Sequence, residues 1–304
     1  MRLAHARAKA SPNSAQTIPK PQHRRGRRPV PISDAVFAVV LKVYLTKSSR
    51  RAIPELNLAY ERGYLEKPIV FNTIWAYLER QSLEKILRDL IVKSSLPLVS
   101  VESIFAVDST GFVGSRYIRW NDIKYRGMPE HAWAKIHLAC GVNTHVVTDA
   151  FVGGRDAADL AQLPSLLNTT VQNFTIQEVL AGKAYNSSLN QEVITAIGAS
   201  AYIPFKRSHT GRRAGAWNKA FHRYHENREE FLEHYHQRSN VETVFMMIKT
   251  KFGDSVRSKT EIAMKNEVYC KVLCHNICCL IMSMHDLGLA PELLAESTQK
   301  GAAD

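Results

Sequence analysis

The stretch from residue 101 to residue 112 reads VESIFAVDSTGF, an apolar run that ends at Asp108 and passes into small, polar residues. Its β-branched and aromatic residues predict a strand over 101–108. We expect further strands over 114–120, 133–141 and 146–152, a helix over 156–167, and short strands over 178–181 and 201–204. Consecutive strands followed by alternating helix and strand predict an α/β fold, in which helices flank a mixed sheet.

A second informative stretch, HYHQRSNVETVFMMIKTKFG, covers residues 234–253. Tyr235, Arg238, Glu242 and Lys249 stand at spacings of three, four and seven, which predicts one stripe along a helix. A carboxylate can bind a metal ion and the cations beside it can bind a phosphodiester, so the row suggests a surface for both. The alternative is an ordinary amphipathic helix with a solvated charged side. The apolar row beside it has core spacing: Val241, Val244, Phe245, Ile248 and Phe252.

The four polar residues resemble the Y-R-E-K signature of DDE-type insertion-sequence transposases of bacteria and archaea. The resemblance covers roughly residues 30–285, because further segments occur in the order in which that family has them. These segments are FAVDSTGF, KIHLACGVNTHVV, RDAADLAQLPSLL, VLAGKAYNS, IPFKRS, YHQRSNVE, FGDSVRSK and KNEVYCKVLCHN.

The resemblance implies an RNase-H-like fold and a catalytic site for DNA strand cleavage and transfer. Asp108 would be the first catalytic aspartate, at the end of the first strand and near the centre of the sheet. Glu242 would approach from a helix packed on the sheet, and two Mg²⁺ (or Mn²⁺) ions would be the cofactors. The second catalytic aspartate of the family falls at Gly182, in VLAGKAYNS, and glycine has no side chain that could bind a metal ion.

The loss of that carboxylate bears directly on the chemistry. In-line attack on a phosphodiester uses two divalent ions about 4 Å apart, which stabilise the entering and leaving oxygens. Magnesium binds through few carboxylates, so one missing ligand is expected to impair the reaction. Asp149, Asp156 and Asp159 are candidate substitutes, although Asp159 suits the N-terminus of the expected helix. Apart from the resemblance, Asp108 could instead be a cap or turn residue before the small residues that follow it.

The charge of the chain favours a polyanionic partner. Its 304 residues include 40 Lys or Arg against 28 Asp or Glu, a formal net charge of +12. Residues 1–30 carry eight of the basic residues and no acid, which leaves +4 for the other 274 residues. We interpret this arm as disordered, either touching DNA without sequence preference or serving as a passive extension.

Residues 31–97 have a helical pattern. Pro31 and Ser33-Asp34 are expected to open a first helix, a second lies near 50–61, Asn72-Thr73 cap a third, and a fourth covers 83–92. Basic residues at the connections are compatible with a helix-turn-helix that reads transposon ends. A helical dimerisation or packing module fits the same pattern.

The segment between the last short strand and the Glu242 helix is basic. A loop of this kind with an aromatic residue can follow a DNA backbone and stack on an unpaired base, and a solvated connector is the alternative. The expected DNA-binding residues here are Lys206, Arg207, Arg212, Arg213 and Trp217, in addition to Tyr235, Arg238 and Lys249. The nearby histidines 222, 225, 234 and 236 fit a polar helix surface better than a zinc site, because no cysteine pairs accompany them. The five cysteines are expected to be reduced thiols.

These observations leave two function classes. The first is a DDE transposase that binds the terminal inverted repeats and target DNA, as a homodimer on DNA. The second is a catalytically inactive transposase-derived DNA-binding protein. No apolar run reaches the roughly 18 residues of a membrane span, so we expect a cytoplasmic protein associated with the nucleoid. The expected parts are a basic arm (1–30), a helical DNA-binding or dimerisation domain (31–97), an RNase-H-like DDE transposase domain (98–290) and a flexible tail (291–304).

Overall fold

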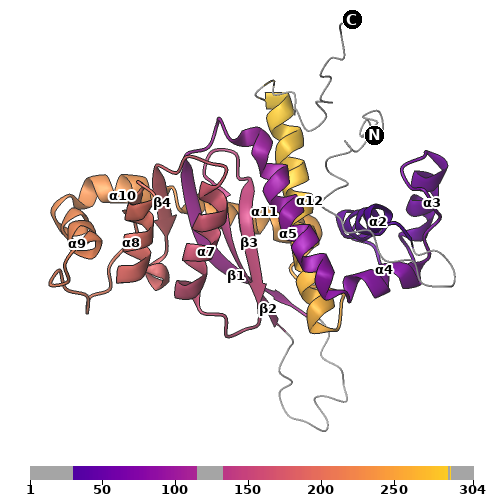
Figure 1. The fold of residues 1–304 in the computed structure, drawn as a ribbon, viewed down its shortest axis with the longest axis horizontal. Coiled ribbons are helices and arrows are strands. Elements are labelled where there is room, and N and C mark those ends of the chain that lie inside the picture. Colours follow the sequence, from indigo (N-terminus) through magenta and orange to yellow (C-terminus); the bar gives the residue numbers. More distant parts are fainter. Residues whose placement is uncertain (1–29, 115–132, 287, 289–304) are drawn as a thin grey trace, which may run out of the picture.

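The computed structural model describes residues 30–114, 133–286 and 288, and its centre is a five-stranded mixed sheet (Figure 1). The strands are β1 (Ile104–Val113), β2 (Trp133–Gly141), β3 (Val147–Gly153), β4 (Glu178–Ala181) and β5 (Ser200–Tyr202), in the order β3-β2-β1-β4-β5. β1 pairs antiparallel with β2 and parallel with β4. The outer pairs are β2 with β3, antiparallel, and β4 with β5, parallel. The α/β prediction is therefore confirmed, while the expected strand over 114–120 lies almost wholly outside the described residues.

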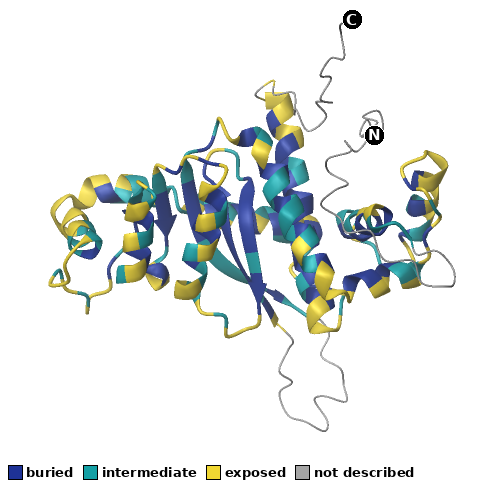
Figure 2. Ribbon diagram, in the orientation of Figure 1, coloured by how far each residue is buried: buried dark blue, intermediate teal, exposed yellow. Residues whose placement is uncertain are grey.

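Helices cover both faces of the sheet because its side chains alternate. On β1, Phe105 and Val107 pack into an apolar cluster with α7 (Asp159–Val171) and α8 (Ser188–Ala196). Ala106 and Phe112 belong instead to the cluster of α11 (Ser239–Phe252) and α12 (Glu261–Asp286). The strands are accordingly mostly buried between two helical layers, as the dark blue sheet in Figure 2 shows.

In the described part of the chain four α-helices precede the sheet: α2 (Ile32–Tyr44), α3 (Ile53–Glu61), α4 (Phe71–Leu78) and α5 (Gln81–Ser95). α2, α4 and α5 pack against α12, and their apolar side chains join the cluster that also contains α11 and one face of the sheet. The first helix begins directly after Pro31, as predicted, and Asp34 lies in its first turn. Asp34 accepts hydrogen bonds from the N–H groups of Glu66 and Lys67, at 2.9 and 3.3 Å. The predicted cap of the third helix is wrong, because α4 follows Val70 and Asn72 and Thr73 lie within its first turn.

Helix α12 is long and apolar enough to cross a membrane by length and composition alone, but 67% of its apolar window is buried inside the protein. Its contacts with α2, α4, α5 and the sheet are those of a core helix. Cys270, Cys274 and Cys279 are buried on it as free thiols, in agreement with the prediction.

Two short 3₁₀ turns and two further helices complete the described elements. One turn, η1 (Leu96–Leu98), precedes β1, and the other, η2 (Lys183–Tyr185), follows β4. Helices α9 (Ala216–Glu226) and α10 (Arg228–His236) then lead from β5 towards α11. Figure 1 shows α8, α9 and α10 gathered at the end of the molecule opposite to α3.

Candidate active site

The site is built where β4 ends and β1 continues. Their parallel register pairs Val107 with Ala181, so Asp108 and Gly182 are the next positions along the two strands. The prediction that Asp108 ends its strand is wrong. β1 continues beyond it, because β2 pairs with β1 as far as Val113. Pairing with β4 ends at Val107, and β1 next has a parallel partner at Val113, which forms a bridge with Ser255. Corresponding residues of adjacent strands point to the same face.

Glu242 reaches this point from α11, and Arg238 joins it to Asp108. Arg238 Nη1 lies 2.6 Å from Asp108 Oδ2, and Arg238 Nη2 lies 2.5 Å from Glu242 Oε1. One guanidinium therefore binds both carboxylates, with one nitrogen for each. The structure thus brings together Asp108 and Glu242, which are distant in sequence, while Gly182 follows the strand paired with the Asp108 strand.

The spacing predicted that the polar row lies on a single helix, but the structure divides it between two. Helix α10 ends at His236 and α11 begins at Ser239, with Arg238 between them. The Arg238 N–H donates to the Tyr235 carbonyl at 2.9 Å, and the Val241 N–H donates to the Arg238 carbonyl at 3.0 Å. These tight i to i+3 bonds keep the chain coiled through the break. Tyr235, on α10, therefore remains next to Arg238, and its ring centroid lies 5.7 Å from the Arg238 guanidinium carbon.

Lys249 lies further along α11, beside an open hollow of about 530 Å³. Its Nζ donates to Thr110 Oγ1 at 2.7 Å. The hollow is lined by Asp108, Ser109, Thr110, Glu242, Phe245, Met246, Lys249 and Thr250. Sequence reasoning missed Thr110, Phe245 and Met246 as lining residues, although Met246 follows Glu242 by four positions and could have been placed on the same face.

Burial opposes both kinds of charge in this site. Desolvation raises the pKa of Asp108, while the Ser109 N–H at 2.8 Å and the Arg238 guanidinium act in the opposite direction. Desolvation likewise lowers the pKa of Lys249. The two acids and two cations sum to zero formal charge when all are ionised, so the site is electrically balanced by its own residues.

A network of polar side chains lies on the other face of β1. The Ser109 hydroxyl lies 3.1 Å from Asp159 Oδ1, and His137 Nδ1 lies 3.1 Å from the Tyr185 hydroxyl. The Tyr185 N–H in turn donates to the Gly182 carbonyl at 2.9 Å. Through Tyr185, this network fixes the turn that begins at Gly182, on the face of the sheet opposite to Asp108.

The side chains present do not fit a site for two metal ions. Of the residues that the structure describes, only Asp108 and Glu242 supply carboxylates to the hollow, both bind Arg238, and the third position is glycine. Among residues 30–114 and 133–286, no group of three or more His, Cys, Asp or Glu side chains is arranged to hold a metal ion. An added Cβ at Gly182 would meet no atom within 4 Å, and the backbone there is extended, with φ of −67°. Residue 182 thus has room for the Cβ atom with which an aspartate side chain begins.

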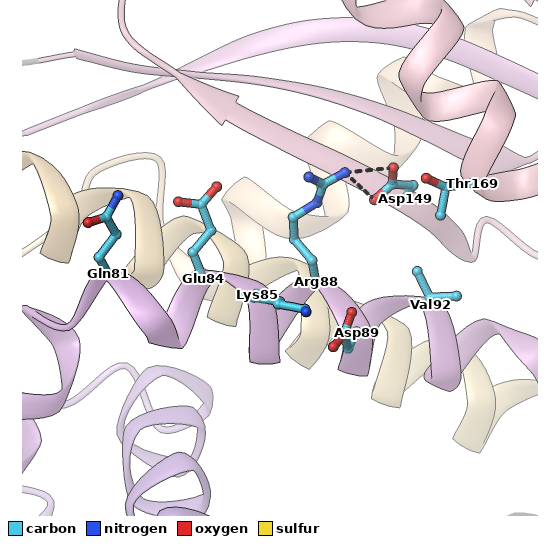
Figure 3. A pocket seen from close by; sticks show the side chains of 8 residues that line it. All are labelled: Gln81, Glu84, Lys85, Arg88, Asp89, Val92, Asp149 and Thr169. Carbon is cyan, nitrogen blue, oxygen red and sulfur yellow. Dashed lines mark hydrogen bonds and ion pairs between the residues drawn. The ribbon is translucent and has the colours of Figure 1, made fainter. Parts of the chain in front are cut away.

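None of the three candidate substitutes occupies the missing position. Asp149 lies on β3, where both its oxygens accept from Arg88 Nη2, at 3.1 and 2.9 Å (Figure 3). Figure 3 shows this pair in a separate hollow lined by residues of α5, α7 and β3. Asp159 binds Lys135 at 2.8 Å on the α7 side of the sheet, and Asp156 is exposed before α7.

The basic loop differs from its predicted role. Trp217 is only 3% exposed, its Nε1–H donates to the Thr210 carbonyl at 2.8 Å, and its ring packs on Phe205. It cannot stack on a base, so that expectation is wrong. Arg213 covers the indole at 4.9 Å and binds the Ser188 hydroxyl. The other predicted cations of this loop are exposed but line no part of the Asp108 hollow: Lys206, Arg207 and Arg212.

The sheet order, with acidic residues from the central strand and from a helix on the same face, defines an RNase-H-like fold of the class that processes nucleic-acid strands. Residues 100–277 match the family model described as transposase DDE domain, which is more than half of the chain. The protein therefore belongs to the family of DDE transposases. No curated protein and no solved structure matched it.

Proposed function

We propose that this chain binds the ends of an insertion sequence as a transposase, and that Gly182 leaves its cleavage and strand-transfer site incomplete. The family acts in DNA transposition. The observation that carries the proposal is the arginine bridge from Asp108 to Glu242 beside Gly182. The terminal inverted repeats and the target DNA would be the partners, bound by a homodimer in the nucleoid.

Charge supports the binding half of this proposal. A phosphodiester entering the hollow would meet Lys249, beside two carboxylates that share the Arg238 guanidinium. The exposed cations of the loop before α9 would add contacts to the DNA backbone outside the hollow. The Y-R-E-K residues would thus serve binding even where catalysis is impaired.

The same observations favour a second candidate, a transposase-derived protein that binds DNA without cutting it. With aspartate at 182 the site would carry one more negative charge than its two cations balance, which would favour a divalent ion. With glycine at 182 the site has no such excess negative charge to attract a divalent ion. Magnesium- or manganese-dependent activity separates the two candidates.

DNA binding can be measured by fluorescence anisotropy over a range of salt concentrations. Probes are short duplexes from the DNA flanking the gene, with a scrambled duplex for comparison. Lys249→Gln should weaken binding and lower the salt slope by about one, the loss of one phosphate contact. Lys265→Gln is the matched control, since Lys265 pairs with Glu261 and lines no part of the hollow. Equal slopes for the natural chain and Lys249→Gln would remove Lys249 from the DNA interface.

Cleavage and metal binding test the role of Gly182. The natural chain should bind Mg²⁺ or Mn²⁺ weakly in calorimetry and cut element ends little or not at all, because one carboxylate is missing. Gly182→Asp should raise the affinity for the metal and restore cutting. Gly154→Asp is the control, because Gly154 also has open space around its Cα but stands after β3.

Two outcomes would change the conclusion. Cutting by the natural chain that is lost in Asp108→Ala or Glu242→Ala would mean that another group replaces the missing aspartate. Intact DNA binding with no cutting by either the natural chain or Gly182→Asp would favour the non-catalytic protein.

A further inference from the structure

Met246 is an exposed apolar side chain in the middle of a polar site. It is 61% exposed, and in the described part of the chain only Leu189, at 62%, is a more exposed large apolar residue. The core contacts of α11 are made by other side chains, namely Val241, Val244, Phe245, Ile248 and Phe252. Helix α11 therefore does not need Met246 for its packing.

The surroundings of Met246 are those of a substrate site. It stands one helical turn after Glu242 and about one turn before Lys249, so the three side chains follow one face of α11. All three line the hollow that contains Asp108, and the buried Phe245 beside them adds apolar surface. The hollow thus offers an apolar contact between a carboxylate pair and a cation.

We propose that Met246 is a wedge that packs against the base or sugar of an unpaired nucleotide, next to the phosphate bound at Lys249. The inference rests on the proposed function and names the form of DNA that the site takes. Methionine is unbranched and polarizable, so it adapts to different bases without hydrogen bonds. Proteins that kink or open DNA commonly insert such apolar wedges between bases.

A DNA strand fits this surface better than a protein partner does. The residues around Met246 include Thr250, Lys249 and two carboxylates that share one arginine. The lysine and the threonine suit a sugar–phosphate backbone. An interface core between proteins is depleted in charged residues. Contact with a second copy of the chain is an outcome that the experiment distinguishes.

Methionine oxidation provides a direct footprint. The natural chain is oxidised with dilute peroxide in EDTA, free and bound to a forked duplex with an unpaired end, and each methionine is followed by mass spectrometry. Bound DNA should slow the oxidation of Met246 by about fivefold or more, because a thioether against a base is closed to solvent. Met282, which is 52% exposed near the end of α12, should react at an unchanged rate in the same sample.

A fluorescent base tests the wedge itself. With 2-aminopurine at the first paired position of the fork, the natural chain should increase the emission as that base unstacks. Met246→Ala should lose most of the increase and Met246→Leu should keep it. Met282→Ala is the control and should behave like the natural chain.

The results separate this inference from the proposed function. No binding to any DNA would overturn both. Salt-dependent binding with Met246 oxidised at the free rate, or with equal emission for Met246→Ala and the natural chain, would overturn the wedge alone. Protection of Met246 that depends on protein concentration in the absence of DNA would assign the surface to a second copy and also overturn it.

Discussion

At the scale of single residues, Arg238 determines the state of the site. Its guanidinium binds Asp108 and Glu242 at once, so it places both carboxylates and offsets one of their two negative charges. The family pattern predicted which residues meet, because catalytic positions keep their order along the chain. The bridge could not be predicted, since helical spacing does not tell which way a long side chain turns. Trp217 shows the same limit, as its burial depends on aromatic neighbours from other segments.

His137 makes the stability of the protein sensitive to acid. It is fully buried, and desolvation lowers its pKa from 6.5 to about 4. Between these values the unfolded chain binds a proton that the folded chain does not, so stability falls as the pH drops from 6.5 towards 4. The shift corresponds to about 3 kcal/mol.

We expect His137→Gln to reduce this loss, which chemical denaturation at pH 7 and pH 4.5 would measure as a smaller difference between the two free energies of unfolding. Tyr185→Phe removes the hydroxyl that lies near His137 Nδ1 without removing an acid-titrating group. It should therefore lower stability similarly at both pH values. An unchanged acid loss in His137→Gln would mean that His137 is protonated in the folded chain.

At the scale of elements, the end of α11 is held by buried charges. Lys271 Nζ donates to the carbonyls of Gly253 and Ser255, at 2.7 and 2.8 Å. Glu267 accepts from the N–H of Ser258 at 2.8 Å and from Lys42 Nζ of α2 at 3.2 Å. The segment after α11 also bonds to β1, where the Val113 N–H donates to the Asp254 carbonyl. Helix α2 is thus linked through Glu267 to the loop that joins α11 with the central strand.

Element positions were mostly predictable, and their ends were less so. The bounds of β2 and β4 agree with the expected 133–141 and 178–181, because each is a continuous apolar or alternating run. The break between α10 and α11 was missed, because the polar row stays in phase across it. The buried pairing of Lys42 with Glu267 was also missed, since the two residues are 225 positions apart.

The Lys42–Glu267 pair gives a stability prediction. Both side chains are about 4% exposed, so Lys42→Met would leave Glu267 charged and buried without its cation. We expect a loss of about 3–5 kcal/mol in the free energy of unfolding. Adding Glu267→Gln should recover part of it, because a neutral amide keeps an oxygen for the Ser258 N–H. Denaturant unfolding of both variants measures this.

A second pair on the same helix supplies the control. Lys265 and Glu261 lie 2.7 Å apart with a largely exposed glutamate, so Lys265→Met should cost less than about 1 kcal/mol. Similar small losses for Lys42→Met and Lys265→Met would contradict the burial of the first pair.

At the scale of the whole molecule, α12 unites the helices before the sheet with the sheet itself. Asn276 is fully buried and bonds to both sides, with Nδ2 donating to the Val147 carbonyl of β3 at 2.8 Å and to Ser94 Oγ of α5 at 2.9 Å. Asn266 donates to the Leu78 carbonyl at the end of α4 at 2.8 Å. The change from helical to strand pattern near residue 98 suggested a boundary, but a periodic pattern cannot show that a C-terminal helix packs against both parts.

This packing predicts the outcome of dividing the chain. A fragment of residues 98–288 would expose the apolar side of α12 that α2, α4 and α5 cover, and it would leave the buried amides of Asn266 and Asn276 without several partners. Each such loss costs about 1–3 kcal/mol, in addition to the exposed apolar area. We expect the fragment to aggregate or to unfold without a cooperative transition, while the full chain unfolds in one step by calorimetry. A chain that lacks residues 1–28 is the control, because it keeps every described helix and should melt near the temperature of the full chain. A soluble 98–288 fragment with a cooperative transition near that same temperature would show that α2–α5 contribute little to the stability of the sheet, and that the two parts fold independently.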